Sequence, residues 1–385
     1  MNVPPWLIVI GDLTPLGGMD RANHALALYL ARREGAEVHL VAHRAWHDLT
    51  ALPNVRLHRI ARPGGRDMLG LPLLARAGRA RARQLAARGA RVVVNGGNCR
   101  WGDVNWVHYV HAAWGPRQDG GVLRRVKAFA FHRWALRSER ACLREARVVI
   151  ANSERTRADL LERLDLRPER AHTVYYGNDP EEFRPPDAAE RAAARARLGW
   201  TDDRPALAFV GALGDLRKGF DTLYDAWRRV SREPGWDGRL VVAGAGRSLA
   251  GWKARAAAEG ERAIEFLGFR QDVPAVLRAC DGLVSPTRYE AYGLNVQEAL
   301  ACGLPALVSR SAGVAERYPA ALEDLLIPDP DDAADLAARL LRWREGVGKP
   351  RAALSAFSER LRDATWDQMA ERLTRLATDP DHDVR

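Results

Sequence analysis

The stretch that decides the fold is PTRYEAYGLNVQEALACGLP, residues 286–305. It follows a short apolar run at residues 282–284 that is typical of a buried strand. The residues from Leu294 onward are predicted to form a helix, which Gly303 ends and Pro305 cannot continue. A strand that passes through a loop into a helix is the α/β unit whose carboxyl edge binds ligands.

This stretch carries two glutamates, Glu290 and Glu298, which are eight positions apart. On one continuous helix of 3.6 residues per turn they would lie about 80° apart, so they would not share a face. We therefore expect Glu290 in the loop and Glu298 in the second turn of the helix, where they would hold two parts of an elongated ligand. The helix N-terminus near Gly293 would offer free N–H groups to a phosphate. The alternative is a pair of solvent-exposed carboxylates, which is common for glutamate.

The pattern Glu-x7-Glu followed by Ala-Leu-Ala-Cys-Gly-Leu-Pro resembles the hallmark of the retaining family 4 glycosyltransferases. The resemblance implies the GT-B fold, an α/β architecture of two Rossmann-like doubly wound parallel-sheet domains facing a central cleft. It also implies a bacterial-type, hexosyltransferase-like enzyme that transfers a sugar from a nucleotide-diphosphate sugar to an acceptor hydroxyl with retention. The acceptor would be a carbohydrate, a lipid-linked molecule or a small molecule. No metal and no cofactor other than the donor substrate is implied.

The resemblance assigns roles to the residues of this stretch. The first glutamate of the family motif, here Glu290, contacts the donor sugar. The second, here Glu298, binds the ribose hydroxyls. The backbone between them, here Tyr292, Gly293 and Leu294, meets the sugar and the diphosphate. Such enzymes act in the biosynthesis of polysaccharides, glycolipids or glycosylated natural products.

A second segment, GALGDLRKG at residues 211–219, follows one predicted strand and precedes a predicted helix. It resembles the family segment Gly-Arg-x4-Lys-Gly, in which the lysine contacts the diphosphate, and Lys218 matches that lysine. Ala212 stands where the family has its arginine, so we expect Arg217 to supply the second cation. A cation at a helix N-terminus is electrostatically unfavourable unless an anion binds there.

Three glycines in two further loops match the family pattern. Gly244 follows the predicted strand at residues 240–243 and corresponds to a glycine turn near the nucleotide. Gly17 and Gly18 precede the first predicted helix and resemble the loop that approaches the transferring phosphate. In each case the alternative is a glycine that serves only the turn.

One histidine is a candidate for the reaction centre. His111 follows a strand predicted over residues 104–110, and family enzymes often place a histidine there, near the donor sugar. His108 is predicted to point to the opposite face of the sheet, because strand side chains alternate. The alternative for His111 is a structural histidine with a satisfied hydrogen bond.

Strand and helix patterns alternate along both halves of the chain, which predicts parallel doubly wound sheets. We expect an acceptor-binding domain over residues 1–178 and a nucleotide-sugar-binding domain over residues 179–360. Residues 361–385 are predicted to form a helix that crosses back to the first domain, followed by a tail.

The composition is that of an ordinary globular protein of 385 residues, enough for two or three domains. Its four cysteines show no C-x-x-C spacing, so neither a zinc site nor a disulfide framework is expected. No run approaches the ~20 apolar residues of a membrane-spanning helix. We expect a cytoplasmic protein, with peripheral contact to the inner face of the membrane as an open alternative.

The net charge of +10 is unevenly distributed. Residues 1–178 carry an excess of 14 positive charges, and the remainder of the chain is net negative. A basic half favours an anionic acceptor or an anionic membrane surface, and the plainer alternative is a solvated basic face.

Three rival functions are compatible with parts of the sequence. A nucleotide-sugar epimerase would share the sheets but would not be expected to carry the Glu-x7-Glu segment. A catalytically silent GT-B partner subunit is suggested by Ala212. A nucleic-acid-binding protein would need basic and aromatic residues on one surface, whereas the twelve tryptophans are scattered. We therefore expect no nucleic-acid partner.

Overall fold

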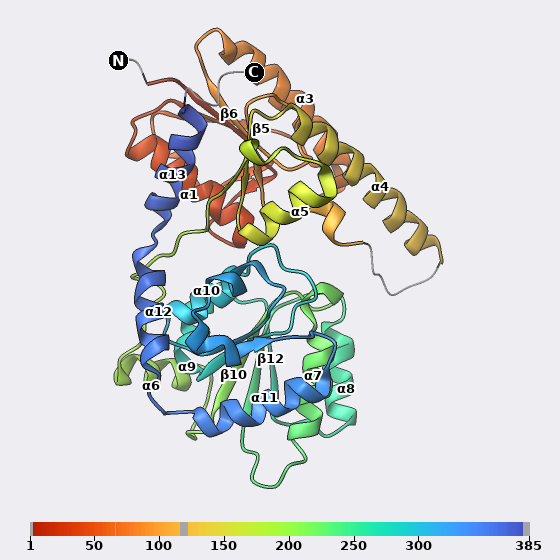
Figure 1. The fold of residues 1–385 in the computed structure, drawn as a ribbon, viewed down its shortest axis with the longest axis vertical. Helices are drawn as coiled ribbons and strands as arrows, with labels where there is room; N and C mark the ends of the chain where they lie inside the picture. The colour runs from red at the N-terminus through yellow and green to blue at the C-terminus, as the bar shows by residue number, and fades with distance from the viewer. Residues whose placement is uncertain (1–2, 66, 116–121, 380–385) are drawn as a thin grey trace. The chain divides into compact units, whose positions relative to one another are not determined.

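The structure is a computed structural model that describes residues 3–65, 67–115 and 122–379 (Figure 1). These residues form two compact units. Unit 1 runs to Gly177 and resumes at Thr365, and unit 2 comprises Asn178–Ala364. The last residues of the predicted tail, 380–385, lie outside the described part of the chain.

The framework of unit 1 is a seven-stranded sheet in the order β5-β3-β1-β6-β7-β8-β9, and every pair is parallel. In chain order its strands are β1 (Trp6–Val9), β3 (Val38–Ala42), β5 (Val55–Arg59), β6 (Arg91–Asn95), β7 (Val104–Val107), β8 (Val148–Ala151) and β9 (Ala171–Thr173). Two short strands, β2 (Asp12–Leu13) and β4 (Arg44–Ala45), pair beside it. Its central strands are continuous apolar runs because parallel sheets are covered on both faces.

The helices of unit 1 are α1 (Gly18–Arg32), α2 (His47–Thr50), α3 (Asp67–Ala86), α4 (Val122–Glu145), α5 (Glu154–Leu164) and α13 (Trp366–Thr378). The C-terminal helix α13 packs against α1 and β8, so the end of the chain is part of the same unit as its beginning. A Cβ atom at Gly177 would lie 2.4 Å from the backbone of Trp366, so only glycine allows this approach.

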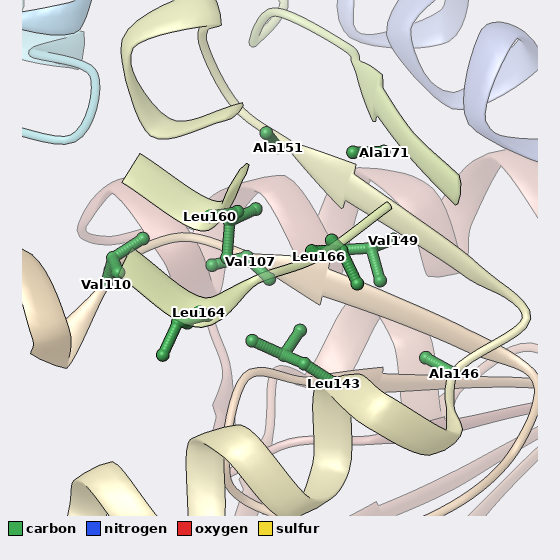
Figure 2. Packing of buried hydrophobic residues seen from close by; sticks show 10 residues of the cluster. All are labelled: Val107, Val110, Leu143, Ala146, Val149, Ala151, Leu160, Leu164, Leu166 and Ala171. Atoms are coloured by element: carbon green, nitrogen blue, oxygen red, sulfur yellow. The ribbon is translucent and has the colours of Figure 1, made fainter. Parts of the chain in front are cut away.

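Part of the core of unit 1 lies between β7, β8, α4 and α5, as Figure 2 shows. Aliphatic side chains from these elements interlock in the close-packed manner of protein interiors. Its ten buried residues are Val107, Val110, Leu143, Ala146, Val149, Ala151, Leu160, Leu164, Leu166 and Ala171.

Unit 2 contains a six-stranded parallel sheet in the order β12-β11-β10-β13-β14-β15. Its strands are β10 (Ala206–Val210), β11 (Arg239–Ala243), β12 (Ile264–Gly268), β13 (Gly282–Ser285), β14 (Ala306–Ser309) and β15 (Leu326–Ile327). Its helices are α6 (Ala188–Arg197), α7 (Phe220–Val230), α8 (Leu249–Ala258), α9 (Val273–Ala279), α10 (Leu294–Ala301), α11 (Ala333–Gly346) and α12 (Ala352–Asp363).

The predicted fold class is confirmed, because both units are α/β and both sheets are parallel. In unit 2 the strand order runs outward from β10 in one direction and from β13 in the other. The carboxyl ends of β10 and β13 therefore flank a topological switch point, where open α/β sheets bind ligands. Within the described residues, no helix is long and apolar enough to cross a membrane.

One predicted strand was too long. The strand expected over residues 104–110 ends at Val107, and a single 3-10 turn begins at His111 (His111–Ala113). His108 is therefore the first residue beyond the strand, and the alternation rule that separated it from His111 does not apply.

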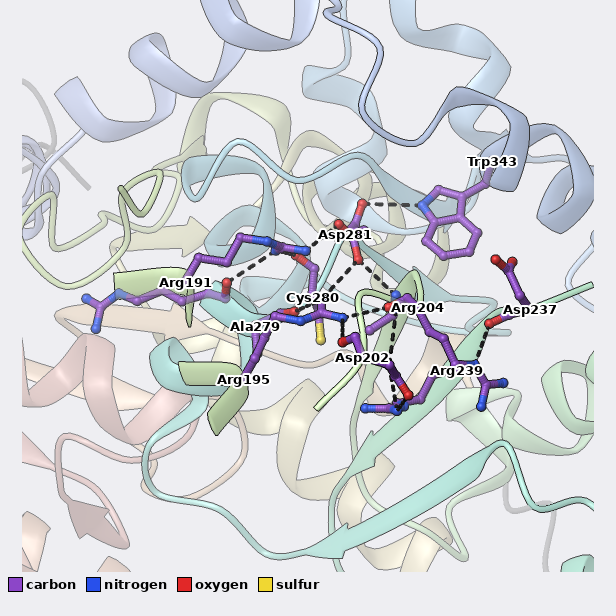
Figure 3. Close-up of polar contacts among 12 residues, drawn as sticks. Arg191, Arg195, Asp202, Arg204, Asp237, Arg239, Ala279, Cys280, Asp281 and Trp343 are labelled. Atoms are coloured by element: carbon purple, nitrogen blue, oxygen red, sulfur yellow. Dashed lines mark hydrogen bonds and ion pairs between the residues drawn. The ribbon is translucent and has the colours of Figure 1, made fainter. Parts of the chain in front are cut away.

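Helix α6 is joined to the sheet of unit 2 by an ion-pair network centred on Asp281 (Figure 3). One carboxylate oxygen accepts from the Arg191 guanidinium at 2.7 Å, and the other accepts from the backbone N–H of Ala206 at 2.9 Å. Arg195, whose side chain is 8% exposed, lies 3.7 Å from the same carboxylate and donates to the carbonyl of Ala279 at 3.1 Å. The network thus ties α6 to the amino ends of β10 and β13.

We predict that Asp281→Ala destabilises the protein by about 3 kcal/mol, because it removes one partner of a buried pair and leaves the Arg195 charge uncompensated. The matched control is Glu323→Ala, which removes the exposed pair with Arg310 and should cost ~1 kcal/mol or less. Urea denaturation of the two variants and the wild type measures both values. Equal costs for the two variants would contradict the assigned role of the network.

Candidate functional site

The candidate site of unit 2 is built from the loops that leave β10 and β13, which are neighbouring strands. The loop after β10 covers residues 211–219 and leads into α7, and the loop after β13 covers residues 286–293 and leads into α10. Asn295, in the first turn of α10, donates from its side chain to the carbonyl of Val210 at 2.9 Å. The N-terminus of α10 is thereby tied to the carboxyl end of β10.

The structure brings together two residues that the sequence singled out in separate motifs. The Lys218 ammonium and the Glu290 carboxylate form a direct ion pair, although 72 positions separate them in the chain. Both side chains are about four-fifths buried, so the pair is largely withdrawn from solvent. When a ligand binds, the lysine ammonium can leave the glutamate and pair with an anionic group of the ligand. The glutamate carboxylate can then accept a hydrogen bond from a hydroxyl of the ligand.

A glycine permits this approach. Gly219 adopts φ 65°, a left-handed conformation that glycine accepts without strain. A Cβ atom built on Gly219 would lie 1.8 Å from the carbonyl oxygen of Pro286, which is far inside any contact distance. The Lys-Gly pair in the first loop is thus a packing requirement for the second loop.

Arg288 joins the same two loops, and the sequence analysis did not identify it. Its guanidinium donates to both oxygens of Asp221 at 2.8 and 2.7 Å, and to the carbonyl of Leu216 at 2.6 Å. It also pairs with Asp331 at 2.5 Å. These carboxylates raise the pKa of Arg288, and the hydrogen bond that Arg288 donates to Asp221 is the largest cause. In the sequence, Arg288 is marked only by its position after the predicted strand, two residues before Glu290.

Arg217, expected to be the second cation, lies in an ion pair with Asp215. Its guanidinium donates to Asp215 at 2.6 to 3.1 Å, in a partly buried setting. The balance of these contacts lowers the pKa of Asp215 in spite of its burial, so the carboxylate is charged. Part of the positive charge of Arg217 is therefore already neutralised.

The N-terminus of α10 carries the remaining donor-motif residues. The helix begins at Leu294 after Gly293, and no side chain of the described residues caps it. The carbonyls of Glu290 and Tyr292 accept from the backbone N–H groups of Gly313 and Val314 at 3.0 and 2.7 Å, which fixes the loop. Glu298 lies on α10 and is 8% exposed.

Tyr292 is a structural support in this arrangement. Its hydroxyl contacts Gln297 and accepts from the Arg317 guanidinium at 2.8 Å. Burial raises the pKa of Tyr292, so the hydroxyl is neutral. Gln297 and Arg317 were not predicted, because nothing local in the sequence links them to the motif.

Gly244 also has a packing role. A Cβ atom on Gly244 would lie 1.8 Å from the carbonyl oxygen of Gly211, and the N–H of Gly211 donates to the carbonyl of Ala243 at 3.1 Å. The loops after β10 and β11 therefore touch through their backbones.

Three predicted residues belong to unit 1. Gly17, at φ 81°, precedes α1, and Gly18 is the first residue of that helix. His111 begins the 3-10 turn after β7. Gly17 and His111 thus follow the carboxyl edge of the sheet in their own unit.

His108 is the centre of a polar network at this edge. Its Nδ1 lies 2.5 Å from the Tyr176 hydroxyl, and its Nε2 lies 2.7 Å from Asn95 Oδ1 and 3.0 Å from Asn23 Nδ2. Burial lowers the pKa of His108 to about 3, so the ring is neutral. Asn23 and Tyr176 escaped the sequence analysis because each is distant from His108 along the chain.

The backbone of the His111 turn is held by a buried glutamate. Glu139, on α4, is fully buried and accepts from the N–H groups of His111 and Ala112 at 2.9 and 3.3 Å. Burial raises its pKa to about 7 against these two hydrogen bonds and the nearby charge of Arg140. Glu139 therefore positions the turn that carries His111.

Among the described residues no group of three or more histidine, cysteine, aspartate or glutamate side chains could hold a metal ion. All four cysteines are free thiols and buried.

Two parallel α/β units define a two-domain protein of the GT-B class. The family model described as glycosyl transferases group 1 matches residues 204–345, and the model described as Glycosyltransferase Family 4 matches residues 16–182. The chain belongs to glycosyltransferase family 4.

Curated relatives match part of the chain. A D-inositol 3-phosphate glycosyltransferase of Saccharomonospora viridis is 35% identical over 215 residues, 52% of this chain and 49% of that protein. A GDP-mannose-dependent monoacylated alpha-(1-6)-phosphatidylinositol monomannoside mannosyltransferase of Corynebacterium glutamicum is 31% identical over 212 residues, 52% of this chain and 54% of that protein. The chain thus spans about half the length of the curated relatives it matches.

Solved structures share the fold over nearly the whole chain. WaaG, a glycosyltransferase involved in lipopolysaccharide biosynthesis, superimposes with a TM-score of 0.76 at 21% identity, covering 97% of this chain and 99% of that one. Anabaena HepE in complex with UDP and glucose superimposes with a TM-score of 0.66 at 17% identity, covering 97% and 99%.

We predict that the stability contribution of Glu139 depends on pH. Its folded pKa of about 7 exceeds the ordinary glutamate value, so its contribution is complete below about pH 4.5 and is lost as the pH rises through 7. Glu139→Gln removes this dependence. The free energy of unfolding of the variant should therefore gain roughly 2–4 kcal/mol relative to wild type between pH 5 and pH 8.

The measurement is urea denaturation at the two pH values, and the matched control is Glu162→Gln on the exposed face of α5. The control should show a difference from wild type that is the same at both pH values. A pH-independent difference for Glu139→Gln would show that this carboxylate titrates as an ordinary surface glutamate.

Proposed function

We propose that this protein is a retaining glycosyltransferase that moves a sugar from a nucleotide-diphosphate sugar to an acceptor hydroxyl. The observation that carries the proposal is the Lys218–Glu290 ion pair beside the uncapped N-terminus of α10. A cation and free backbone N–H groups together suit a diphosphate, and a carboxylate next to them suits sugar hydroxyls. Family membership and the names of the relatives support this activity.

In the proposed donor complex the two partners of the ion pair separate. The diphosphate takes over the Lys218 ammonium and the N–H groups at the start of α10, with Gly293 and Leu294 supplying the backbone contact. Glu290 is then released to accept hydrogen bonds from the sugar. The ion pair of the free protein thus holds both groups in position in advance, which is how preorganised electrostatic groups contribute to catalysis.

Glu298 is proposed to bind the ribose hydroxyls, and Tyr292 to hold the loop in place. Arg217 stabilises the leaving diphosphate as far as its pair with Asp215 allows, and Gly244 closes the nucleotide side of the site. For unit 1, the proposed roles are a backbone contact of Gly17 and Gly18 with the transferring phosphate and a contribution of His111 to recognition of the donor sugar. No metal is proposed, since Lys218 and the helix N-terminus supply the positive charge.

The reaction follows from these groups. The acceptor hydroxyl attacks the anomeric carbon on the face from which the diphosphate leaves, and a phosphate oxygen takes its proton. The bond from the anomeric carbon to the diphosphate breaks, and the new glycosidic bond keeps the configuration. Negative charge grows on the leaving diphosphate, where Lys218 faces it. The acceptor is proposed to be a carbohydrate, a lipid-linked molecule or a small molecule.

A cytoplasmic location with peripheral membrane contact is also proposed, on the surface of α4. Val126, Phe129 and Trp134 are 58%, 56% and 41% exposed on this helix. Exposed basic residues lie among them, and the Arg133 guanidinium lies 5.8 Å from the centre of the Phe129 ring. Apolar and basic side chains on one exposed helix suit an anionic bilayer surface.

The roles of the two glutamates predict that their variants differ in which ligands they bind more weakly. Glu298→Ala should weaken binding of both the nucleoside diphosphate and its nucleotide sugar by roughly 10- to 100-fold, because each loses hydrogen bonds from the ribose worth about 1.5–3 kcal/mol. Glu290→Ala should weaken only the nucleotide sugar. It should leave diphosphate affinity unchanged or raised, since Lys218 no longer has an internal partner.

Calorimetric titration with UDP, GDP and ADP, and with their common sugar conjugates, makes this comparison without knowledge of the acceptor. Equal losses of diphosphate affinity in both variants would contradict the division of roles. Unchanged binding of the diphosphate and of the nucleotide sugar in both variants would contradict the glycosyltransferase proposal. It would also contradict the alternative of a catalytically silent subunit that still binds a donor.

The membrane contact predicts that Phe129→Ser/Trp134→Ser lowers sedimentation with phosphatidylglycerol vesicles by tenfold or more, since each buried aromatic side chain contributes about 1.5–3 kcal/mol. Phe269→Ser is the control, because Phe269 is 65% exposed in unit 2. Vesicle binding that responds equally to both variants would exclude α4 as the contact surface.

A further inference from the structure

A large groove lies in unit 1, at the amino ends of its strands. Its volume is about 1740 Å³, and it is lined by the last turns of α3, the end of α4 and the segments that precede β6, β7, β8 and β9. The proposed donor and catalytic residues follow carboxyl ends of strands, so this groove is on the opposite edge of the sheet from Gly17 and His111. Nothing in the proposed reaction uses it.

The lining of the groove is strongly basic. Three carboxylates, those of Asp103, Glu145 and Glu169, stand among eight arginines. The eight are Arg79, Arg83, Arg91, Arg100, Arg144, Arg147, Arg167 and Arg170.

The three carboxylates are already engaged. Asp103 accepts from the Arg147 guanidinium at 2.8 Å and from the backbone N–H of Val92 at 2.7 Å. Glu145 pairs with Arg100 at 2.5 Å, and Glu169 lies 3.5 Å from Arg167. Three of the eight arginines, Arg100, Arg147 and Arg167, are the partners of these carboxylates.

The remaining arginines are partly explained by helix ends. Arg83 and Arg144 lie in the last turns of α3 and α4, where a cation suits the helix dipole. Arg170 donates to the carbonyls of Leu143 and Arg144 at 3.2 and 3.1 Å, which caps α4. Within the described part of the chain, neither Arg79 nor Arg83 forms an ion pair, and Arg79 is not at a helix end.

Positive charge is crowded at this edge. Burial lowers the pKa of Arg170, and the charge of Arg167 lowers it further. An anion in the groove would relieve this repulsion. Guanidinium groups bind phosphate through two parallel hydrogen bonds, so arginines suit phosphate better than other anions.

We propose that this groove binds a ligand with clustered phosphate groups, at a site separate from the donor site. Its volume exceeds the 300–1,000 Å³ that is usual for a small-molecule pocket, which favours several phosphates spread along it. Such groups occur in free polyphosphates and at the surface of anionic phospholipids. The proposal does not rest on the glycosyltransferase activity, because its residues are all in unit 1 and none belongs to the donor motifs.

The test is calorimetric titration of the full chain with tripolyphosphate, beside sedimentation with phosphatidylglycerol vesicles. The variant Arg79→Glu/Arg83→Glu should weaken binding at least tenfold, since one hydrogen bond to a charged group is worth about 1.5–3 kcal/mol. The control Arg229→Glu/Arg232→Glu reverses the same number of charges, on two exposed arginines near the end of α7 in unit 2, and should change binding less than threefold.

Loss of tripolyphosphate binding in the groove variant supports the proposal with a free polyphosphate as ligand. Loss of vesicle binding alone supports it with a lipid headgroup as ligand. Binding of neither probe by the wild type, or equal losses in the groove variant and the control, overturns it. If Arg79→Glu/Arg83→Glu does not fold, Arg144→Glu/Arg167→Glu gives the same comparison, because both residues are exposed.

Discussion

The ion pair between Lys218 and Glu290 is the interaction on which the candidate site depends. It can form only because β10 and β13 are neighbours at the switch point of the sheet and because Gly219 lets the two loops touch. Arg288 also joins the two loops, through the carbonyl of Leu216, and it pairs with Asp221 at the start of α7. These contacts connect the two loops in the absence of a ligand, and a bound donor would exchange partners with the two charged groups.

Much of the fold could be predicted from the sequence because parallel strands are continuous apolar runs and the helices between them are punctuated by glycine and proline. The strand was predicted to reach residue 110 because Val110 continues the apolar pattern. That prediction was wrong, since Val110 lies outside the sheet. Its side chain belongs instead to the core between α4 and α5. A run of apolar residues in the sequence indicates that side chains are buried. Burial alone does not distinguish a strand from the segment that follows it.

Site residues could be predicted where a single sequence motif contains them. They could not be predicted where the site is formed by residues that are far apart in the chain. Glu290 and Lys218 were found in separate motifs, and only the sheet order brings them together. The His108 network remained hidden because Asn23 and Tyr176 come from α1 and from the end of unit 1. For Arg217 the signal was present, since Asp215 lies two positions earlier, and a local pair competes with a ligand for the same guanidinium.

The central claim is that Lys218 and the start of α10 form a donor-diphosphate site that needs no metal. Calorimetric titration of wild type and Lys218→Ala with UDP, GDP and ADP, in the presence of a chelator, tests it most directly. We predict that one diphosphate binds the wild type and binds Lys218→Ala at least tenfold more weakly, the cost of one hydrogen bond to a charged group. Equal affinity in the two proteins, or binding by the wild type only when a divalent metal is added, would contradict the claim.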